Sequence, residues 1–236
     1  MAPLKFCANI SWLFAELPEL TQRMRDAARA GFRAVEAAWI YSSDLKELKT
    51  VKDETGLEFA LINTPPVSRI HLMAGRVPAG ADRCAVAMEM EDTFVQNLKH
   101  AAGVLSKEGI LGLIEPINTR ITDPRYFLDS PHQAAVILQR VAHPSIRMQM
   151  DIYHWQIMDG NLTQNIRKYL PMTGHIQIAQ VPDRHEPDSD GELSYTYLFK
   201  LLEELDYQDY IGCEYKPQRS TEAGLDWLRR YWSSHN

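Results

Sequence analysis

The sequence predicts an α/β protein, and within that class a (β/α)8 TIM barrel. Eight short β-type runs follow one another within 236 residues, about the length of a typical barrel. Helical patterns separate most of these runs, which is typical of repeated βα units on a parallel sheet. There is no Gly-x-Gly-x-x-Gly or P-loop pattern, so an open doubly wound sheet is the less favoured alternative.

Size and composition predict one domain over residues 1–236. The chain is 45% hydrophobic, enough to bury one large core, and it lacks the Pro/Gly/Ser-rich break expected between two domains. We therefore expect a single TIM-barrel domain.

Charge and cysteine content narrow the possible partners. A net charge of -6 without a basic cluster argues against nucleic acid and favours a small-molecule substrate. Cys7, Cys84 and Cys213 are odd in number and widely spaced, which predicts neither a disulfide framework nor a thiolate metal site and indicates a reducing compartment. No apolar stretch approaches the roughly 20 residues that span a bilayer. We expect a cytoplasmic protein without a membrane partner.

The first half of the chain carries four β-type runs, at residues 5–10, 34–39, 58–63 and 67–74. An amphipathic pattern from Leu17 to Ala28 predicts the first helix, with Gly31 as its stop. For the second helix, the sequence predicts Ser43 as the N-terminal cap and Gly56 as the C-terminal end.

The third and fourth runs lie only a few residues apart, and no helix fits between them. Parallel neighbours need a crossover of about a dozen residues or more. The barrel is therefore expected to be incomplete or distorted at its third β/α unit, with the fourth run swinging out, pairing in the opposite direction or merging with the third.

In the second half of the chain, predicted strands and helices alternate more regularly. The longest helical pattern covers residues 81–109 and leads into an apolar run that starts at Leu111 and stops on Glu115. Ser130 and Pro131 predict the start of the next helix, which ends before residue 144. Further strands are predicted at residues 147–152, 175–181 and 210–215, and further helices at residues 162–170, capped by Asn161, at residues 198–205, and from Ser220 onward.

Polar side chains occur at the ends of the last four predicted strands. Laying these strands parallel places Glu115, Asp151, Gln177 and Glu214 near their C-terminal ends, the edge that carries chemistry in parallel α/β proteins. Carboxylates crowded together repel one another unless they share a cation, and an all-oxygen set suits Mg2+ or Mn2+. We expect a divalent metal site there; the alternative is a hydrogen-bonded polar cluster.

Other polar residues are expected near the same strand ends. His154 and Arg184 are candidate substrate contacts, because a guanidinium can hold a carboxylate through two parallel hydrogen bonds. The alternative for Arg184 is a solvated loop residue. His71 is also a candidate contact, although a hydrogen-bonded structural histidine is the preferred interpretation. Three residues are weaker candidates for lining the barrel mouth, namely Asn9, Trp12 and Asn63.

Five motifs carry a resemblance that runs from end to end. They are ANISWLF at residues 8–14, LINTPP at 61–66, IEPIN at 114–118, MDIYH at 150–154 and GCEY at 212–215. Together they resemble the hydroxypyruvate isomerases of the xylose isomerase-like barrel superfamily. The resemblance implies an aldose-ketose type isomerase of carbohydrate metabolism that interconverts hydroxypyruvate and 2-hydroxy-3-oxopropanoate.

The same resemblance implies roles for particular residues. Glu115 and Glu214 would be the proton donor and acceptor, and Glu115, Asp151, Gln177 and Glu214 would bind the metal. A cation that chelates both substrate oxygens would acidify the intervening C–H and stabilise an enediolate. Related sugar isomerases and epimerases often have His where this chain has Gln177, so metal preference is expected to differ.

The chain also departs from the family pattern. Between Pro66 and Ser68 a loop and the whole third helix are missing, which indicates a shortened form with reduced stability and activity. The alternative functions are a related sugar or sugar-phosphate isomerase or epimerase, or a catalytically impaired barrel that only binds a partner. A metal-dependent DNA-repair nuclease is disfavoured, because it would need more metal ligands and a basic face.

Overall fold

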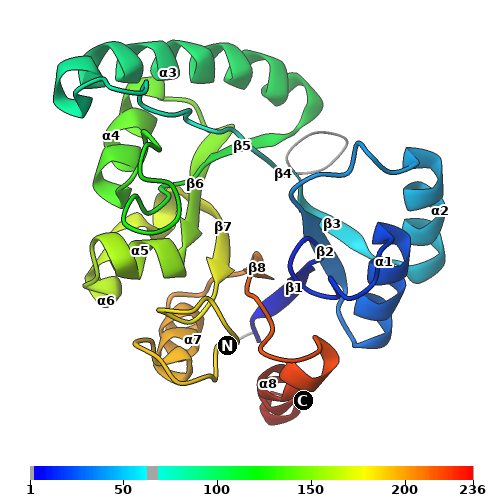
Figure 1. Cartoon of the computed structure of the whole chain (residues 1–236). Helices are drawn as coiled ribbons and strands as arrows, with labels where there is room; N and C mark the ends of the chain where they lie inside the picture. Colours follow the sequence, from blue (N-terminus) through cyan, green and yellow to red (C-terminus); the bar gives the residue numbers. More distant parts are fainter. Residues whose placement is uncertain (1–2, 63–68, 236) are drawn as a thin grey trace. The chain divides into compact units, whose positions relative to one another are not determined.

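The computed structural model describes residues 3–62 and 69–235 (Figure 1). The chain divides into two compact units, residues 1–63 with 177–236 and residues 64–176. In the described residues eight strands follow one another, β1 to β8, in the order of a closed parallel barrel. The predicted βα alternation is present, and each of the eight predicted runs overlaps a strand, although the sixth and seventh strands begin one and two residues earlier than predicted.

The first unit contains a parallel sheet in the order β8-β1-β2-β3. Its strands are β1 (Lys5–Asn9), β2 (Ala34–Ala37), β3 (Glu58–Ile62) and β8 (Tyr210–Cys213). Its helices are α1 (Leu20–Arg29), α2 (Leu45–Thr55), α7 (Tyr195–Glu204) and α8 (Asp226–Ser234). Strand β7 (Thr173–Ile178) contributes its last two residues to this unit.

An aromatic cluster fixes α7 and α8 against this sheet. The ring of Phe6, on β1, lies 5.3 Å from Phe199 and Trp227 and 5.1 Å from Tyr231, between ring centroids. All three pairs are edge-to-face, a geometry that adds about 0.5–1.5 kcal/mol per pair beyond burial. The N-terminal strand is thereby tied to the last two helices of the chain.

The second unit contains β4 (Arg69–His71), β5 (Leu111–Ile114) and β6 (Ile146–Asp151), which pair in parallel in this order. Its helices are α3 (Arg83–Leu105), α4 (Pro131–Val141), α5 (Ile152–Met158) and α6 (Leu162–Tyr169). The 23-residue α3 packs beside α4, and both lie on the outside of β5 and β6 (Figure 1). No helix in the described part of the chain is both long and apolar enough to cross a bilayer.

Several predicted helix ends are confirmed. Ser130 caps α4 by accepting a hydrogen bond from the backbone N–H of Gln133, and Pro131 is its first residue. Gly56 ends α2 in the left-handed conformation, with φ of 69°. Glycine adopts this conformation without the steric cost that a Cβ imposes.

Other helix ends were predicted wrongly. Asp44 rather than Ser43 caps α2, because its side chain accepts from the N–H groups of Lys46 and Glu47. Asn161 makes no side-chain cap, since it is itself left-handed, with φ of 46°. A 3-10 turn follows Ser220, so α8 starts only at Asp226.

The third β/α unit was expected to be distorted. Strand β3 runs parallel to β2 and β4 runs parallel to β5, so the fourth run does not pair in the opposite direction with its described neighbour. The junction at residues 63–68 lies outside the described residues. Distortion there, and a single domain over residues 1–236, stay predictions.

Candidate active site and metal centre

The second unit brings three predicted site residues together. Glu115 directly follows β5, Asp151 is the last residue of β6, and His154 lies in α5. All three side chains are buried, and one ligand atom from each lies within 4.8 Å of the other two. His154 Nε2 is 3.4 Å from Asp151 Oδ2 and 3.8 Å from Glu115 Oε1. Two carboxylates and an imidazole therefore converge where two neighbouring strands end.

Asp151 is also the N-terminal cap of α5, a role that the sequence did not reveal. Its Oδ1 accepts hydrogen bonds from the backbone N–H groups of Tyr153, at 2.8 Å, and His154, at 3.4 Å, and so caps α5. The cap turns the chain sharply from strand into helix. This turn places His154 back over the strand end that it follows.

His71 joins the same group from the end of β4. Its Nδ1 lies 3.4 Å from Glu115 Oε2. Burial lowers the pKa of His71 to about 4, and the nearby His154 contributes to this shift. The ring is therefore neutral at pH 7, and no hydrogen-bond partner for its Nε2 is found among the described residues.

The first unit holds Glu214, directly after β8. Its Oε1 accepts a hydrogen bond from Asn9 Nδ2 at 3.1 Å, and its Oε2 lies 2.6 Å from a terminal nitrogen of Arg184. The Arg184 guanidinium also stacks over the Trp12 ring, 4.6 Å from its centroid. This ion pair is mostly shielded, since the two side chains are 13% and 15% exposed. Arg184 is thus no solvated loop residue, and the structure places it on a predicted catalytic carboxylate.

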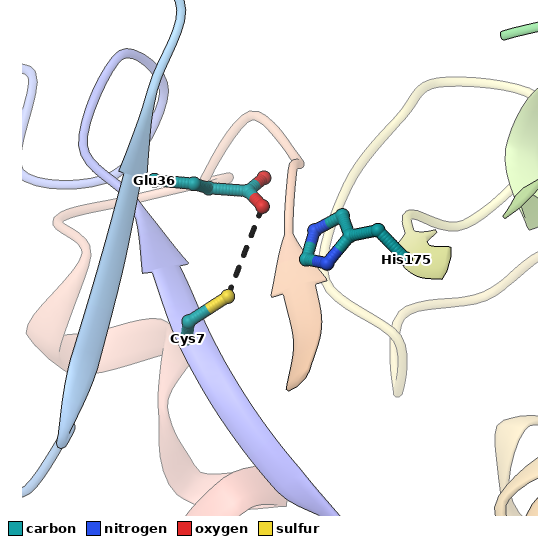
Figure 2. A group of neighbouring side chains, drawn as sticks. All are labelled: Cys7, Glu36 and His175. Carbon is teal, nitrogen blue, oxygen red and sulfur yellow. Dashed lines mark hydrogen bonds between the residues drawn. The ribbon is translucent and has the colours of Figure 1, made fainter. Parts of the chain in front are cut away.

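Glu36 is a buried acid on β2 that the sequence analysis did not single out. Its Oε1 accepts from Asn9 Nδ2 at 2.8 Å and from Gln177 Nε2 at 2.7 Å. Figure 2 shows the Cys7 thiol directed at the other oxygen, with an Sγ–Oε2 distance of 3.7 Å. The only signal in the sequence is a single acid inside the apolar run Ala-Val-Glu-Ala.

These contacts link the two predicted ligands of the first unit. Gln177 donates to Glu36, and Asn9 donates to both Glu36 and Glu214. The Gln177 amide nitrogen donates in this bond, and a cation would be bound through the amide oxygen. In the second unit, Glu115 and Asp151 form the other pair. That all four side chains bind one ion stays a prediction.

The donor chemistry suits a hard divalent cation. Carboxylate oxygens from Glu115, Asp151 and Glu214 and an amide oxygen from Gln177 are ligands that Mg2+ and Mn2+ prefer. Ligand atoms of Glu115 and Asp151 lie within 4.8 Å of each other, with the His154 imidazole beside them. A bound cation would relieve the repulsion between the two carboxylates.

Comparisons with known proteins identify relatives along nearly the whole chain. Residues 66–231 match the family described as "Xylose isomerase-like TIM barrel". A protein of Danio rerio named "Putative hydroxypyruvate isomerase" is 71% identical, over 100% of this chain and 98% of that protein. The "Hydroxypyruvate isomerase" of Escherichia coli (strain K12) is 37% identical, over 97% of this chain and 99% of that enzyme.

A solved structure agrees with the predicted fold. The crystal structure of "AP endonuclease, family 2 from Brucella melitensis" superposes with a TM-score of 0.88 at 37% identity, covering 96% of this chain and 98% of that one. The prediction of a TIM barrel is confirmed, and so is the prediction of an isomerase. The chain belongs to the hydroxypyruvate isomerase family, within the xylose isomerase-like TIM barrels.

Proposed function

We propose that this chain interconverts hydroxypyruvate and 2-hydroxy-3-oxopropanoate. The observation that carries the proposal is the buried convergence of Glu115, Asp151 and His154 at the ends of neighbouring strands, in a chain 71% identical to a relative that bears the hydroxypyruvate isomerase name. The reaction is an internal redox shift, from ketone to aldehyde, and it consumes no nucleotide cofactor. Its substrate is a small hydroxy-keto acid, in keeping with a chain of net charge -6 that has no basic cluster.

We propose Mg2+ or Mn2+ as the cofactor, with Glu115, Asp151, Gln177 and Glu214 as its ligands. This assignment is supported by the strand-end positions of the four residues and by their oxygen chemistry. A bound divalent cation supplies Lewis-acid polarisation of the substrate oxygens.

The two glutamates move the protons. One carboxylate removes a proton from the hydroxymethyl carbon of hydroxypyruvate, and the other delivers a proton to the former ketone carbon. The hydroxyl proton passes from the hydroxymethyl oxygen to the former ketone oxygen, so the aldehyde and the new hydroxyl group form with no net gain or loss of protons. Two groups are needed because each must be in the complementary protonation state at its own step. Glu115 and Glu214 are the candidates, and each already has a partner that can stabilise its charged form, His71 for Glu115 and Arg184 for Glu214.

Substrate recognition is assigned to cationic and hydrogen-bonding groups beside these acids. Arg184 can exchange its contact with Glu214 for the substrate carboxylate, since a guanidinium presents five donors in a planar fork. His154 and His71 are the candidate contacts for the hydroxyl and carbonyl oxygens. The ring of His71 is neutral at pH 7, so it would act there as a hydrogen-bond partner without a charge.

The test is a coupled isomerase assay on purified protein loaded with Mg2+ or Mn2+. The substrate panel includes hydroxypyruvate, sugars and sugar phosphates, because a related isomerase or epimerase activity is the alternative. Glu115→Gln and Glu214→Gln should each reduce turnover by about 10²–10⁴-fold, the usual contribution of positioned proton transfer. Glu89→Gln, on the exposed side of α3, is the matched control and should be inert.

Each outcome separates the alternatives. Near-normal rates in either active-site variant would refute the proton-transfer roles. Turnover of a sugar phosphate in preference to hydroxypyruvate would favour the epimerase alternative. Metal binding without turnover of any substrate in the panel would favour an impaired barrel with a binding role.

A further inference from the structure

His154 Nδ1 faces two hydrogen-bond donors from one residue, Asn118, in the loop after β5. The Asn118 side-chain nitrogen Nδ2 lies 2.7 Å from Nδ1, and the Asn118 backbone N–H points at the same atom from 3.4 Å. Asn118 is completely buried and His154 is 2% exposed, so water does not compete for these positions. The contact lies opposite the ring edge that faces Glu115 and Asp151.

The orientation of the Asn118 amide is fixed by its own loop. Its Oδ1 accepts hydrogen bonds from the backbone N–H groups of Ile121, at 3.0 Å, and Thr122, at 3.1 Å. Its Nδ2 also donates to Thr122 Oγ1 at 2.8 Å. Flipping the amide would turn its NH2 group towards two N–H donors and leave its oxygen against the hydroxyl and the ring. The nitrogen therefore faces His154, as the hydrogen-bond network requires.

From these contacts we propose that Asn118 is a positioning residue that holds His154 as the Nε2–H tautomer. A nitrogen that faces two donors must offer a lone pair, so Nδ1 carries no proton. In the neutral ring the proton then lies on Nε2, 3.4 Å from Asp151 Oδ2 and 3.8 Å from Glu115 Oε1. The orienting hydrogen bond on one ring nitrogen thus decides the chemistry of the other.

The tautomer decides whether His154 is a metal ligand. An imidazole that binds a metal through Nε2 needs its proton on Nδ1, and Asn118 blocks that position. His154 is therefore a hydrogen-bond donor beside the two carboxylates, and of these three residues Glu115 and Asp151 are the ligands. The tautomer follows from the geometry; the further step, that Nε2–H donates to a substrate oxygen, rests on the proposed function.

Asn118→Asp is the informative substitution, because it replaces the donor that faces His154 Nδ1 and Thr122 Oγ1 by an acceptor. One aspartate oxygen can still accept from Ile121 and Thr122, so the loop keeps its turn. The other oxygen replaces Nδ2 and can only accept, so it draws a proton onto Nδ1. Thr122→Val is the matched control: it removes the hydroxyl partner of Asn118 and leaves the contact with His154 in place.

The direct readout is long-range 1H–15N NMR of protein labelled with 15N-histidine, recorded without metal at pH 8. His154→Gln identifies the signals by their loss. We expect an unprotonated Nδ1 and a protonated Nε2 in the unaltered chain and in Thr122→Val, and a protonated Nδ1 in Asn118→Asp. A protonated Nδ1 in the unaltered chain would overturn the proposal whether or not the chain is an isomerase.

Metal binding and turnover test the consequences separately. Calorimetric titration with Mn2+ should show affinity within a few-fold of normal for His154→Gln and a loss of about tenfold or more for Glu115→Gln. A comparable loss in both variants would show that His154 is a ligand and overturn the assignment. In the coupled assay, Asn118→Asp should lower kcat/KM by about 10–100-fold, the usual effect of losing an orienting partner, with the melting temperature retained. If Asn118→Asp switches the tautomer but kcat/KM stays normal, the claim that Nε2–H donates to a substrate oxygen is refuted, whereas the assignment of the tautomer stands.

Discussion

Replacing Gly212 by alanine should disturb the first unit through Glu36. A Cβ at position 212 would lie 2.4 Å from both carboxylate oxygens of Glu36. A shift of roughly 1 Å is needed to restore a van der Waals separation, whichever group moves. If the carboxylate moves, its hydrogen bonds of 2.7 Å and 2.8 Å, from Gln177 and Asn9, would exceed the usual limit of about 3.2 Å.

The magnitude follows from these contacts. Overpacking costs about 1–3 kcal/mol, and each hydrogen bond to a charged group contributes about 1.5–3 kcal/mol. Because the carboxylate can relieve the clash by giving up some of its bonds, the two costs are not additive, and we expect a loss of about 3 kcal/mol. For a chain of this length that corresponds to a fall in melting temperature of roughly 6–12 °C.

A double-mutant cycle identifies the cause. Glu36→Asp withdraws the carboxylate by one methylene, so Gly212→Ala should cost only about 1 kcal/mol in that background. Urea unfolding of the four proteins gives the coupling free energy. Gly103→Ala is the control, since a Cβ there meets nothing within 4 Å and alanine should stabilise the α3 interior by about 0.5–1 kcal/mol. If Gly212→Ala destabilises both backgrounds equally, Glu36 is not the group that the new methyl group displaces.

Three further predictions concern pH, substrate and the chain junction. His71 has a pKa of about 4 in the folded chain and near 6.5 in the unfolded chain. The stability that its buried neutral ring contributes is therefore fully present above pH 6.5 and is lost as the pH falls from 6.5 towards 4. His71→Gln removes the titrating group, so the free energy of unfolding in urea should fall by roughly 2 kcal/mol less between pH 7 and pH 5 in the variant than in the unaltered chain. The same pH dependence in both proteins would contradict the argument that burial lowers this pKa. Arg184→Lys should raise KM for a carboxylate substrate, because lysine lacks the planar fork; unchanged kinetics would exclude the clamp. Finally, a family-like loop and helix inserted between Pro66 and Ser68 should raise melting temperature and turnover, and equal values for both chains would show that the segment is dispensable.

The shortened junction stays a prediction, and two lengths motivate it. The alignment with the Danio rerio relative extends over 271 residues, whereas this chain has 236. A βαβ unit takes roughly 30 residues or more, yet six residues separate β3 from β4. The relatives nevertheless match nearly the full length of both chains, so only the restored variant can test the prediction.

The sequence predicted best where an apolar run stops on a polar residue. Glu115 was found in this way, because buried strands of a parallel sheet read as apolar runs and their ends are marked by the first polar side chain. Asp151 was found from its place near the end of the next predicted strand, which is less uniformly apolar. Glu36 was missed because it interrupts such a run instead of ending it. Its partners Asn9 and Gln177 lie 27 and 141 positions away, and only the fold reveals them.

The sequence also failed to predict several short local structures. Helix α5 has seven residues, too few for a helical period to show, and its buried Tyr153 and Trp155 resemble strand residues. Asn118 lies in a loop without any periodicity, so its contact with His154 had no signature. Ser43 and Asp44 are adjacent and are both good capping residues, and the sequence does not decide between them.

The cap at Asp151 has a consequence for how this site must be dissected. Oδ1 accepts hydrogen bonds from two backbone N–H groups at the start of α5, whereas Oδ2 faces His154 Nε2 at 3.4 Å, so the two oxygens of this carboxylate contact different neighbours. Alanine at this position would remove a ligand and loosen the first turn that carries His154, so lost activity could not be traced to either event. Asparagine keeps an oxygen for the helix and replaces only the atom that faces His154. A comparison of the two substitutions would therefore separate the mechanical contribution of Asp151 from its electrostatic one.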